Sequence, residues 1–173
     1  MKEDNAELLE RALEIALREH RRRKDKAGAP YILHPIRLMM RLSDDTERIV
    51  ALLHDVVEDS GITFNYLRDR GFPDRVLEPL RLVTKLPEEH GSDEGYAAFI
   101  TRLQNDPVAR RVKMADLQDN MDLTRFKQPT ERDKKRLEKY QRAYRQLEEV
   151  ERRQAGEAEA TPCANIAETT PRC

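Results

Sequence analysis

One short segment, VALLHDVVEDSG at residues 50–61, combines a histidine with three carboxylates: His54, Asp55, Glu58 and Asp59. Its apolar residues repeat with helical spacing, and the four polar side chains fill most of the opposite arc of such a helix. Like charges one turn apart destabilise a helix by about 0.2–0.5 kcal/mol per pair, and the segment contains no lysine or arginine to offset them. A divalent cation would reverse the sign of this interaction, because carboxylate oxygen and imidazole nitrogen both bind such metals. A solvated polar face that tolerates the repulsion is the alternative.

A second polar group follows an apolar stripe near the segment RVKMADLQDNM, residues 111–121. The stripe and its polar continuation are Val108, Val112 and Ala115, then Asp116, Asp119 and Asn120. Polar groups that are buried in this way need partners, which a metal, a substrate or a basic side chain could supply. Exposure at the edge of the domain would satisfy them equally well.

Two further features lie earlier in the chain. His34, in PYILHP, stands where a loop meets a helix, and it could bind a metal or simply cap or pack against that helix. The basic run HRRRKDKAG, residues 20–28, could bind phosphate through charge-assisted hydrogen bonds and backbone N–H groups. Its alternative is the charged last turn of a helix, where cations suit the helix dipole.

Helices must position these groups, because apolar residues recur at steps of three and four along most of the chain. The predicted helices cover residues 6–22, 35–42, 43–61, 64–71, 73–85, 93–105, 108–123 and 130–153. Thr63 is a candidate N-cap, and Gly61 closes the helix before it. No segment alternates with period two. We therefore expect an all-α helical bundle over residues 1–153 and a disordered tail over residues 154–173.

The composition excludes several classes of protein. Charged residues make up 38% of the 173-residue chain, but the net charge is only −1, which disfavours a nucleic-acid or membrane-surface binder. The two cysteines, Cys163 and Cys173, give no disulfide framework. The N-terminus is too charged for a signal peptide, and no apolar run has membrane-spanning length. These features predict a cytoplasmic protein without a membrane or nucleic-acid partner.

The helix predicted at residues 130–153 carries one apolar stripe: Leu137, Tyr140, Tyr144 and Leu147. The stripe either packs on the core, which is the simpler interpretation, or mediates self-association as a homo-oligomer.

Taken in order, the motifs PYxxHP, HDxxED and KxADxxxN resemble those of HD-domain metal-dependent phosphohydrolases. More narrowly, they resemble the hydrolase domain of RelA/SpoT-type enzymes and the small alarmone hydrolases. The resemblance runs from about residue 6 to residue 125. It favours the metal interpretation, because a single metal site accounts for all of the unusual groups at once.

The resemblance implies a role for individual residues. Four positions match the family's ligands of one divalent metal, usually manganese: His34, His54, Asp55 and Asp116. Two acids match the pair that acts on the attacking water: Glu58 and Asp59. The others match substrate contacts: Lys26 with a phosphate, Asn120 with the sugar, and Tyr31 as a wall of the pocket.

The chain departs from the family at Asp25, where bacterial members carry an arginine that packs on guanine. Arg23 and Lys24 are candidates to replace that arginine, so the base preference stays open. The resemblance implies hydrolysis of the 3′-pyrophosphate of (p)ppGpp to GDP or GTP and pyrophosphate. A phosphatase acting on a 2′- or 5′-phosphate, or a non-catalytic nucleotide sensor, is the alternative. We expect no synthetase activity, because the chain ends too early for a synthetase domain.

Overall fold

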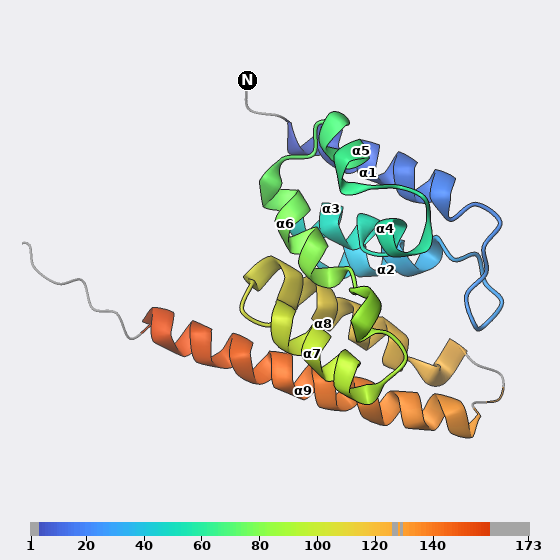
Figure 1. Cartoon of the computed structure of the whole chain (residues 1–173), viewed down its shortest axis with the longest axis vertical. Coiled ribbons are helices and arrows are strands. Elements are labelled where there is room, and N and C mark those ends of the chain that lie inside the picture. The colour runs from blue at the N-terminus through green and yellow to red at the C-terminus, as the bar shows by residue number, and fades with distance from the viewer. Residues whose placement is uncertain (1–3, 126–127, 129, 160–173) are drawn as a thin grey trace, which may run out of the picture.

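In the computed structural model, which describes residues 4–125, 128 and 130–159, every regular element is a helix (Figure 1). The α-helices are α1 (Asn5–Glu19), α2 (Leu33–Arg41), α3 (Asp45–Leu53), α4 (Val56–Asp59), α5 (Phe64–Asp69), α6 (Asp74–Val83), α7 (Asp93–Leu103), α8 (Pro107–Met121) and α9 (Glu131–Glu159). Two 3₁₀-helices, η1 (Pro87–Glu89) and η2 (Leu123–Arg125), join them. The predicted all-α class is confirmed. None of the described helices is both long and apolar enough to cross a membrane.

Helix α3 lies at the centre of the bundle. It packs against α1, α2, α6 and α8, and its residues 49–53 are fully buried. The longest helix, α9, runs along α8 on the outside of the bundle (Figure 1). Because α2 and α8 both pack on α3, residues that are far apart in the sequence meet above its C-terminal end.

Side-chain caps fix several helix starts. The predicted cap Thr63 accepts a hydrogen bond from the backbone N–H of Tyr66, and Asp4 accepts one from the N–H of Ala6. Helix α1 ends at Glu19, before the predicted end at residue 22. Arg22 then adopts a left-handed backbone conformation with φ of 66°, which starts the loop that leads to α2.

The helix predicted over residues 43–61 is divided in the structure. Helix α3 ends at Leu53 and α4 begins at Val56, with His54 and Asp55 in the turn between them. The His54 Nδ1–H group donates to the backbone carbonyl of Ala51 over 2.7 Å. That carbonyl is the one that residue 55 would use in a continuous helix, so the side chain competes with the next helical turn. The prediction of one continuous helix was wrong at this point.

Helix α9 extends to Glu159, beyond the predicted end at residue 153. Three of the four residues of its predicted stripe face the core: Leu147 is fully buried, and Tyr140 and Tyr144 pack against the core cluster. Leu137 is half-buried and does not belong to that cluster. Packing on the core is therefore the confirmed interpretation of the stripe. The tail predicted at residues 154–173 is helical as far as residue 159, and residues 160–173 lie outside the described part of the chain. The domain boundary at residue 153 stays a prediction.

We expect the docking of α9 to contribute measurably to stability. Leu147→Ala removes a side chain with no solvent exposure and should lower the free energy of unfolding by about 2–5 kcal/mol, through lost burial and the cavity left behind. Leu17→Ala is the matched control, because Leu17 is 56% exposed and its loss should cost less than about 0.5 kcal/mol. Urea unfolding measures both variants. Equal losses in the two would contradict the docked position of α9.

Candidate active site

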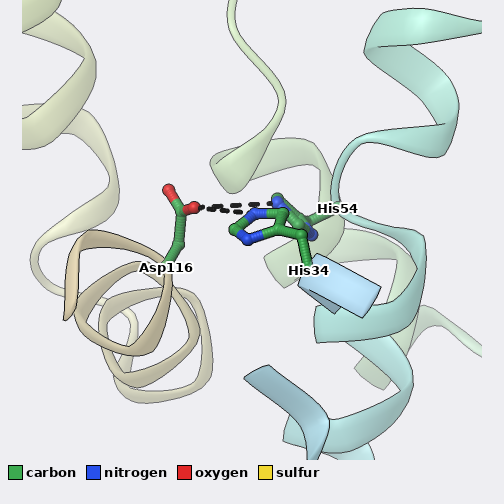
Figure 2. Close-up of side chains that lie close together, drawn as sticks. All are labelled: His34, His54 and Asp116. Carbon is green, nitrogen blue, oxygen red and sulfur yellow. Dashed lines mark ion pairs between the residues drawn. The ribbon is translucent and has the colours of Figure 1, made fainter. Parts of the chain in front are cut away.

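Three distant segments bring two histidines and an aspartate together (Figure 2). His34 lies in the first turn of α2, His54 directly follows α3, and Asp116 lies on α8. One donor atom from each lies within 4.8 Å of the other two. The Oδ1 atom of Asp116 is 3.2 Å from His34 Nε2 and 3.9 Å from His54 Nε2. All three side chains are buried.

Asp55 joins the same cluster from the turn after α3. Its Oδ2 atom lies 3.0 Å from His54 Nε2 and 3.9 Å from His34 Nε2. The hydroxyl of Tyr31 donates to the same oxygen. The four residues that the family resemblance proposed as metal ligands therefore converge on one point of the fold.

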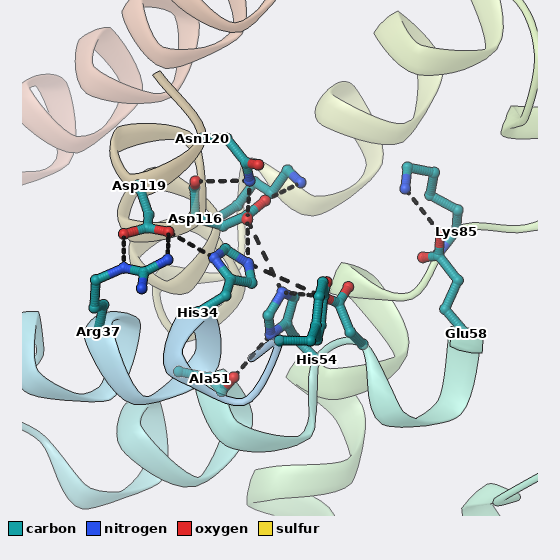
Figure 3. Close-up of polar contacts among 12 residues, drawn as sticks. His34, Arg37, Ala51, His54, Glu58, Lys85, Asp116, Asp119 and Asn120 are labelled. Atoms are coloured by element: carbon teal, nitrogen blue, oxygen red, sulfur yellow. Dashed lines mark hydrogen bonds and ion pairs between the residues drawn. The ribbon is translucent and has the colours of Figure 1, made fainter. Parts of the chain in front are cut away.

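Hydrogen bonds fix the orientation of both imidazoles (Figure 3). His54 Nδ1 is bonded to the carbonyl of Ala51, and His34 Nδ1 lies 2.7 Å from Asp119 Oδ2. The Asp119 carboxylate, which is fully buried, also accepts two hydrogen bonds from Arg37. In the neutral form that binds a metal, each histidine would donate from Nδ1 and carry its lone pair on Nε2, the atom that faces Asp116. A carboxylate behind the histidine is the usual support of a metal-binding imidazole.

The charges within the cluster favour a positive charge between the carboxylates and the imidazoles. Burial alone lowers the pKa of His34, but hydrogen bonds with Asp116 and Asp119 outweigh it and raise this pKa to about 9. Burial likewise raises the pKa of Asp55, and the neighbouring His54 more than reverses that effect, so the pKa of Asp55 is lowered. A divalent metal would supply the same positive charge while the imidazoles stay neutral. The donor set of two nitrogens and two carboxylates fits such an ion.

The second oxygen of Asp116 points away from the histidines, toward Lys113. Lys113 Nζ lies 2.5 Å from Asp116 Oδ2, and Asn120 Nδ2 donates to the backbone carbonyl of Asp116 over 3.0 Å. Burial raises the pKa of Asp116, but the Lys113 ammonium and His34 outweigh it and hold this pKa well below its usual range. Asp116 is therefore kept ionised. Its Oδ1 atom, which also accepts a hydrogen bond from Asn120 Nδ2 over 2.5 Å, is the oxygen that faces the histidines.

A cavity of about 670 Å³ opens onto the cluster. Of the predicted site residues, it is lined by Lys24, Lys26, Tyr31, His34, Asp55, Asp116 and Asn120. Basic side chains that sequence reasoning left without a role also line it: Lys85, Lys113, Arg136 and Lys139. Candidate metal ligands and several cationic side chains therefore share one cavity, and such cations bind phosphate groups through charge-assisted hydrogen bonds.

The predicted acid pair, Glu58 and Asp59, does not line this cavity. Glu58 Oε1 lies 2.9 Å from Lys85 Nζ, and Asp59 Oδ2 lies 3.0 Å from Arg23 Nη2. The sequence shows no basic residue near these acids along the chain, but the fold supplies one to each from a distant segment. Their role toward the attacking water stays a prediction.

Asp25, the position of the expected departure from the family, has a structural role in its loop. Asp25 Oδ1 accepts hydrogen bonds from the backbone N–H groups of Ala27 and Ala29, each over 2.9 Å, so the carboxylate holds the loop in shape. The Arg23 guanidinium lies over the Tyr31 ring, 5.5 Å from its centroid, and it is not among the residues that line the cavity. The substrate roles of Arg23 and Lys24 stay predictions.

Sequence reasoning gave no role to Asp119 or Lys113, which support the cluster from behind. Both had a signal. Asp119 continues the apolar stripe of α8 one turn after Asp116, and Lys113 is the lysine of the KxADxxxN motif. The sequence contained no such feature for Lys85, because only the folded chain brings it to Glu58.

Comparisons with known proteins agree with this arrangement. No family model matches the chain. The human guanosine-3′,5′-bis(diphosphate) 3′-pyrophosphohydrolase MESH1 is 37% identical over 141 residues, which cover 72% of this chain and 74% of MESH1. A protein of the same description from Aquifex aeolicus is 36% identical over 124 residues, 68% of this chain. The chain spans only 18% of the length of that bacterial relative.

A solved structure has a similar fold. It is described as a metazoan ortholog of SpoT that hydrolyses ppGpp, and it matches with a TM-score of 0.66 over 85% of this chain and 95% of its own. At 23% identity, this match supports the fold alone.

We predict that Asp119 is needed for tight metal binding. Asp119→Asn keeps the shape of the side chain but weakens the support of His34 Nδ1, and it should lower metal affinity about 10–100-fold. Asp74→Asn is the control, because Asp74 is exposed and pairs only with Arg68 among the described contacts. Titration of each metal-stripped protein with Mn²⁺ measures the affinities. An unchanged affinity in Asp119→Asn would contradict the arrangement of the cluster.

Proposed function

The chain belongs to the family of RelA/SpoT-type (p)ppGpp hydrolases, and on this premise we propose that it is a metal-dependent guanosine-3′,5′-bis(diphosphate) 3′-pyrophosphohydrolase. The observation that carries the proposal is the cluster of His34, His54 and Asp116, with Asp55 beside both histidines, at a cavity whose lining includes several basic residues. The relatives that extend far beyond this chain include proteins named GTP pyrophosphokinase. We propose hydrolysis without synthesis for this chain.

We infer that the four residues of the cluster would hold one divalent metal. Manganese is our candidate because the family resemblance implies it and because carboxylate oxygens suit it. When bound, such an ion polarises phosphoryl oxygens and lowers the pKa of water, so that hydroxide forms near neutral pH. The chain's own part is to fix the donors. Ala51 and Asp119 set the imidazoles, and Lys113 holds Asp116.

The proposed reaction consumes one water molecule. The water oxygen forms a bond to the phosphorus that carries the ribose 3′-oxygen, and the bond between that phosphorus and the 3′-oxygen breaks. A carboxylate, with Glu58 as the candidate and Asp59 beside it, accepts the proton from water. The 3′-oxygen takes up a proton, and the products from ppGpp are GDP and pyrophosphate.

Basic residues in the cavity would hold the substrate's phosphates. Lys26 faces the cavity, and burial together with the nearby Arg136 lowers the pKa of its ammonium. An anionic phosphate would relieve this unfavourable environment. Asn120 uses its Nδ2 group on Asp116, so its amide oxygen is the atom that would meet a sugar hydroxyl.

Two alternatives concern the activity itself. A phosphatase acting on a 2′- or 5′-phosphate would use the same cluster but release orthophosphate. A non-catalytic sensor would bind the nucleotide without turnover. The cytoplasmic location, the oligomeric state and the absence of a nucleic-acid partner also stay predictions.

Product analysis tests the proposal. We expect the purified chain with Mn²⁺ to release pyrophosphate from ppGpp, and EDTA to abolish this activity. The parallel substrates are NADPH and common 5′-nucleotides, and Asp116→Asn is the inactive comparison. Orthophosphate release from those substrates, without pyrophosphate from ppGpp, would favour the phosphatase. Nucleotide binding without any product would favour the sensor.

A further inference from the structure

The carboxylate of Glu58 is held on both oxygens by one residue. Its Oε1 atom lies 2.9 Å from Lys85 Nζ, and its Oε2 atom accepts a hydrogen bond from the backbone N–H of Lys85 over 3.3 Å. Both side chains are mostly shielded, with 25% exposure for Lys85 and 19% for Glu58. In Figure 3 this pair stands apart from the network around His34, and no dashed line joins Glu58 to that network. In this arrangement the carboxylate is occupied by Lys85.

Lys85 faces the cavity, whereas Glu58 does not. Lys85 lines the cavity together with Lys113 and the cluster residues. The ammonium groups of Lys85 and Lys113 both lie near the Phe99 ring, 5.5 Å and 5.1 Å from its centroid. Lys113 is bonded to Asp116, so one of these two ammonium groups belongs to the cluster, and both residues line the same cavity. A phosphate in this cavity therefore has access to an ammonium that already holds Glu58.

We propose that Lys85 is a positioning residue that couples phosphate binding to the release of Glu58. Before substrate binds, the Lys85 ammonium holds the carboxylate away from the cavity. A substrate phosphate then competes for the ammonium, and the freed carboxylate turns toward the water at the cluster. The inference rests on the proposed function, because it assumes that Glu58 acts on the attacking water.

Charge makes this exchange favourable. Phosphate and pyrophosphate carry more negative charge than a carboxylate and offer more acceptor oxygens to one ammonium. Because Lys85 and Glu58 keep 25% and 19% of their side-chain exposure, water screens part of their attraction, and a phosphate can compete with the carboxylate for the ammonium. The same exchange would keep Glu58 from acting while the cavity holds no phosphate.

The first test needs no turnover. Inorganic pyrophosphate is titrated calorimetrically into the full chain purified with Mn²⁺, as the native protein, Glu58→Gln, Lys85→Met and the double variant. If carboxylate and phosphate compete, Glu58→Gln should bind pyrophosphate about threefold tighter or more, because its ammonium is already released. The gain should vanish when Lys85 is also replaced. An unchanged affinity in Glu58→Gln, or a gain that survives Lys85→Met, would overturn the competition.

The second test distinguishes whether Lys85 holds Glu58 in an inactive position or orients it for the reaction. With ppGpp as substrate, Lys85→Met should raise KM about tenfold through the lost phosphate contact, while kcat stays within about twofold because Glu58 is no longer held. Lys85→Arg should restore the native KM. A large fall in kcat at unchanged KM would overturn the proposal, because Lys85 would then only orient an active carboxylate.

Lys134→Met is the matched control, since Lys134 forms an exposed pair with Glu131 and does not line the cavity. It should leave both measurements unchanged. A native protein that hydrolyses no ppGpp would contradict the proposed function, whereas the pyrophosphate titrations would still decide the competition for Lys85.

Discussion

Two buried imidazoles lie beside the buried carboxylate of Asp116 and the partly exposed carboxylate of Asp55. This concentration of lone pairs favours a positive charge among them. The Nε2 atoms of both histidines face Asp116, and the Nε2 atom of His54 also lies 3.0 Å from Asp55. Protons on the imidazoles can supply the charge, as the raised pKa of His34 shows. A divalent cation supplies it too, and it leaves the histidines in the neutral form that binds metal.

The bundle holds this arrangement through helix packing and a shell of hydrogen bonds. Helix α3 contributes the turn that carries His54 and Asp55, and α2 and α8 pack on α3 with His34 and Asp116. Asp119, which lies behind His34 of α2, accepts a hydrogen bond from Arg37. Arg37 therefore helps to hold Asp119 in place. Fixing the metal-facing donors in advance is favourable, because loose side chains would lose conformational entropy on gathering around an ion.

Much of this could be predicted from the sequence, and the exceptions have physical causes. Apolar periodicity located the helices because one face of each is buried against the core. The motif around His54 indicated a metal, but not the break in the helix, because the break depends on a side chain that competes for the carbonyl of Ala51. Pairs such as Glu58 with Lys85 join residues that only the folded chain brings together. Local spacing carries no information about them.

Anomalous X-ray diffraction from crystals soaked with Mn²⁺ tests the central claim most directly. The account predicts one strong anomalous peak at about 2.0–2.3 Å from the Nε2 atoms of His34 and His54 and from an oxygen of Asp116. It also predicts that crystals of Asp116→Asn lose most of the peak. A fully occupied ion elsewhere in the molecule, with these three donors bound only to one another or to water, would contradict the account.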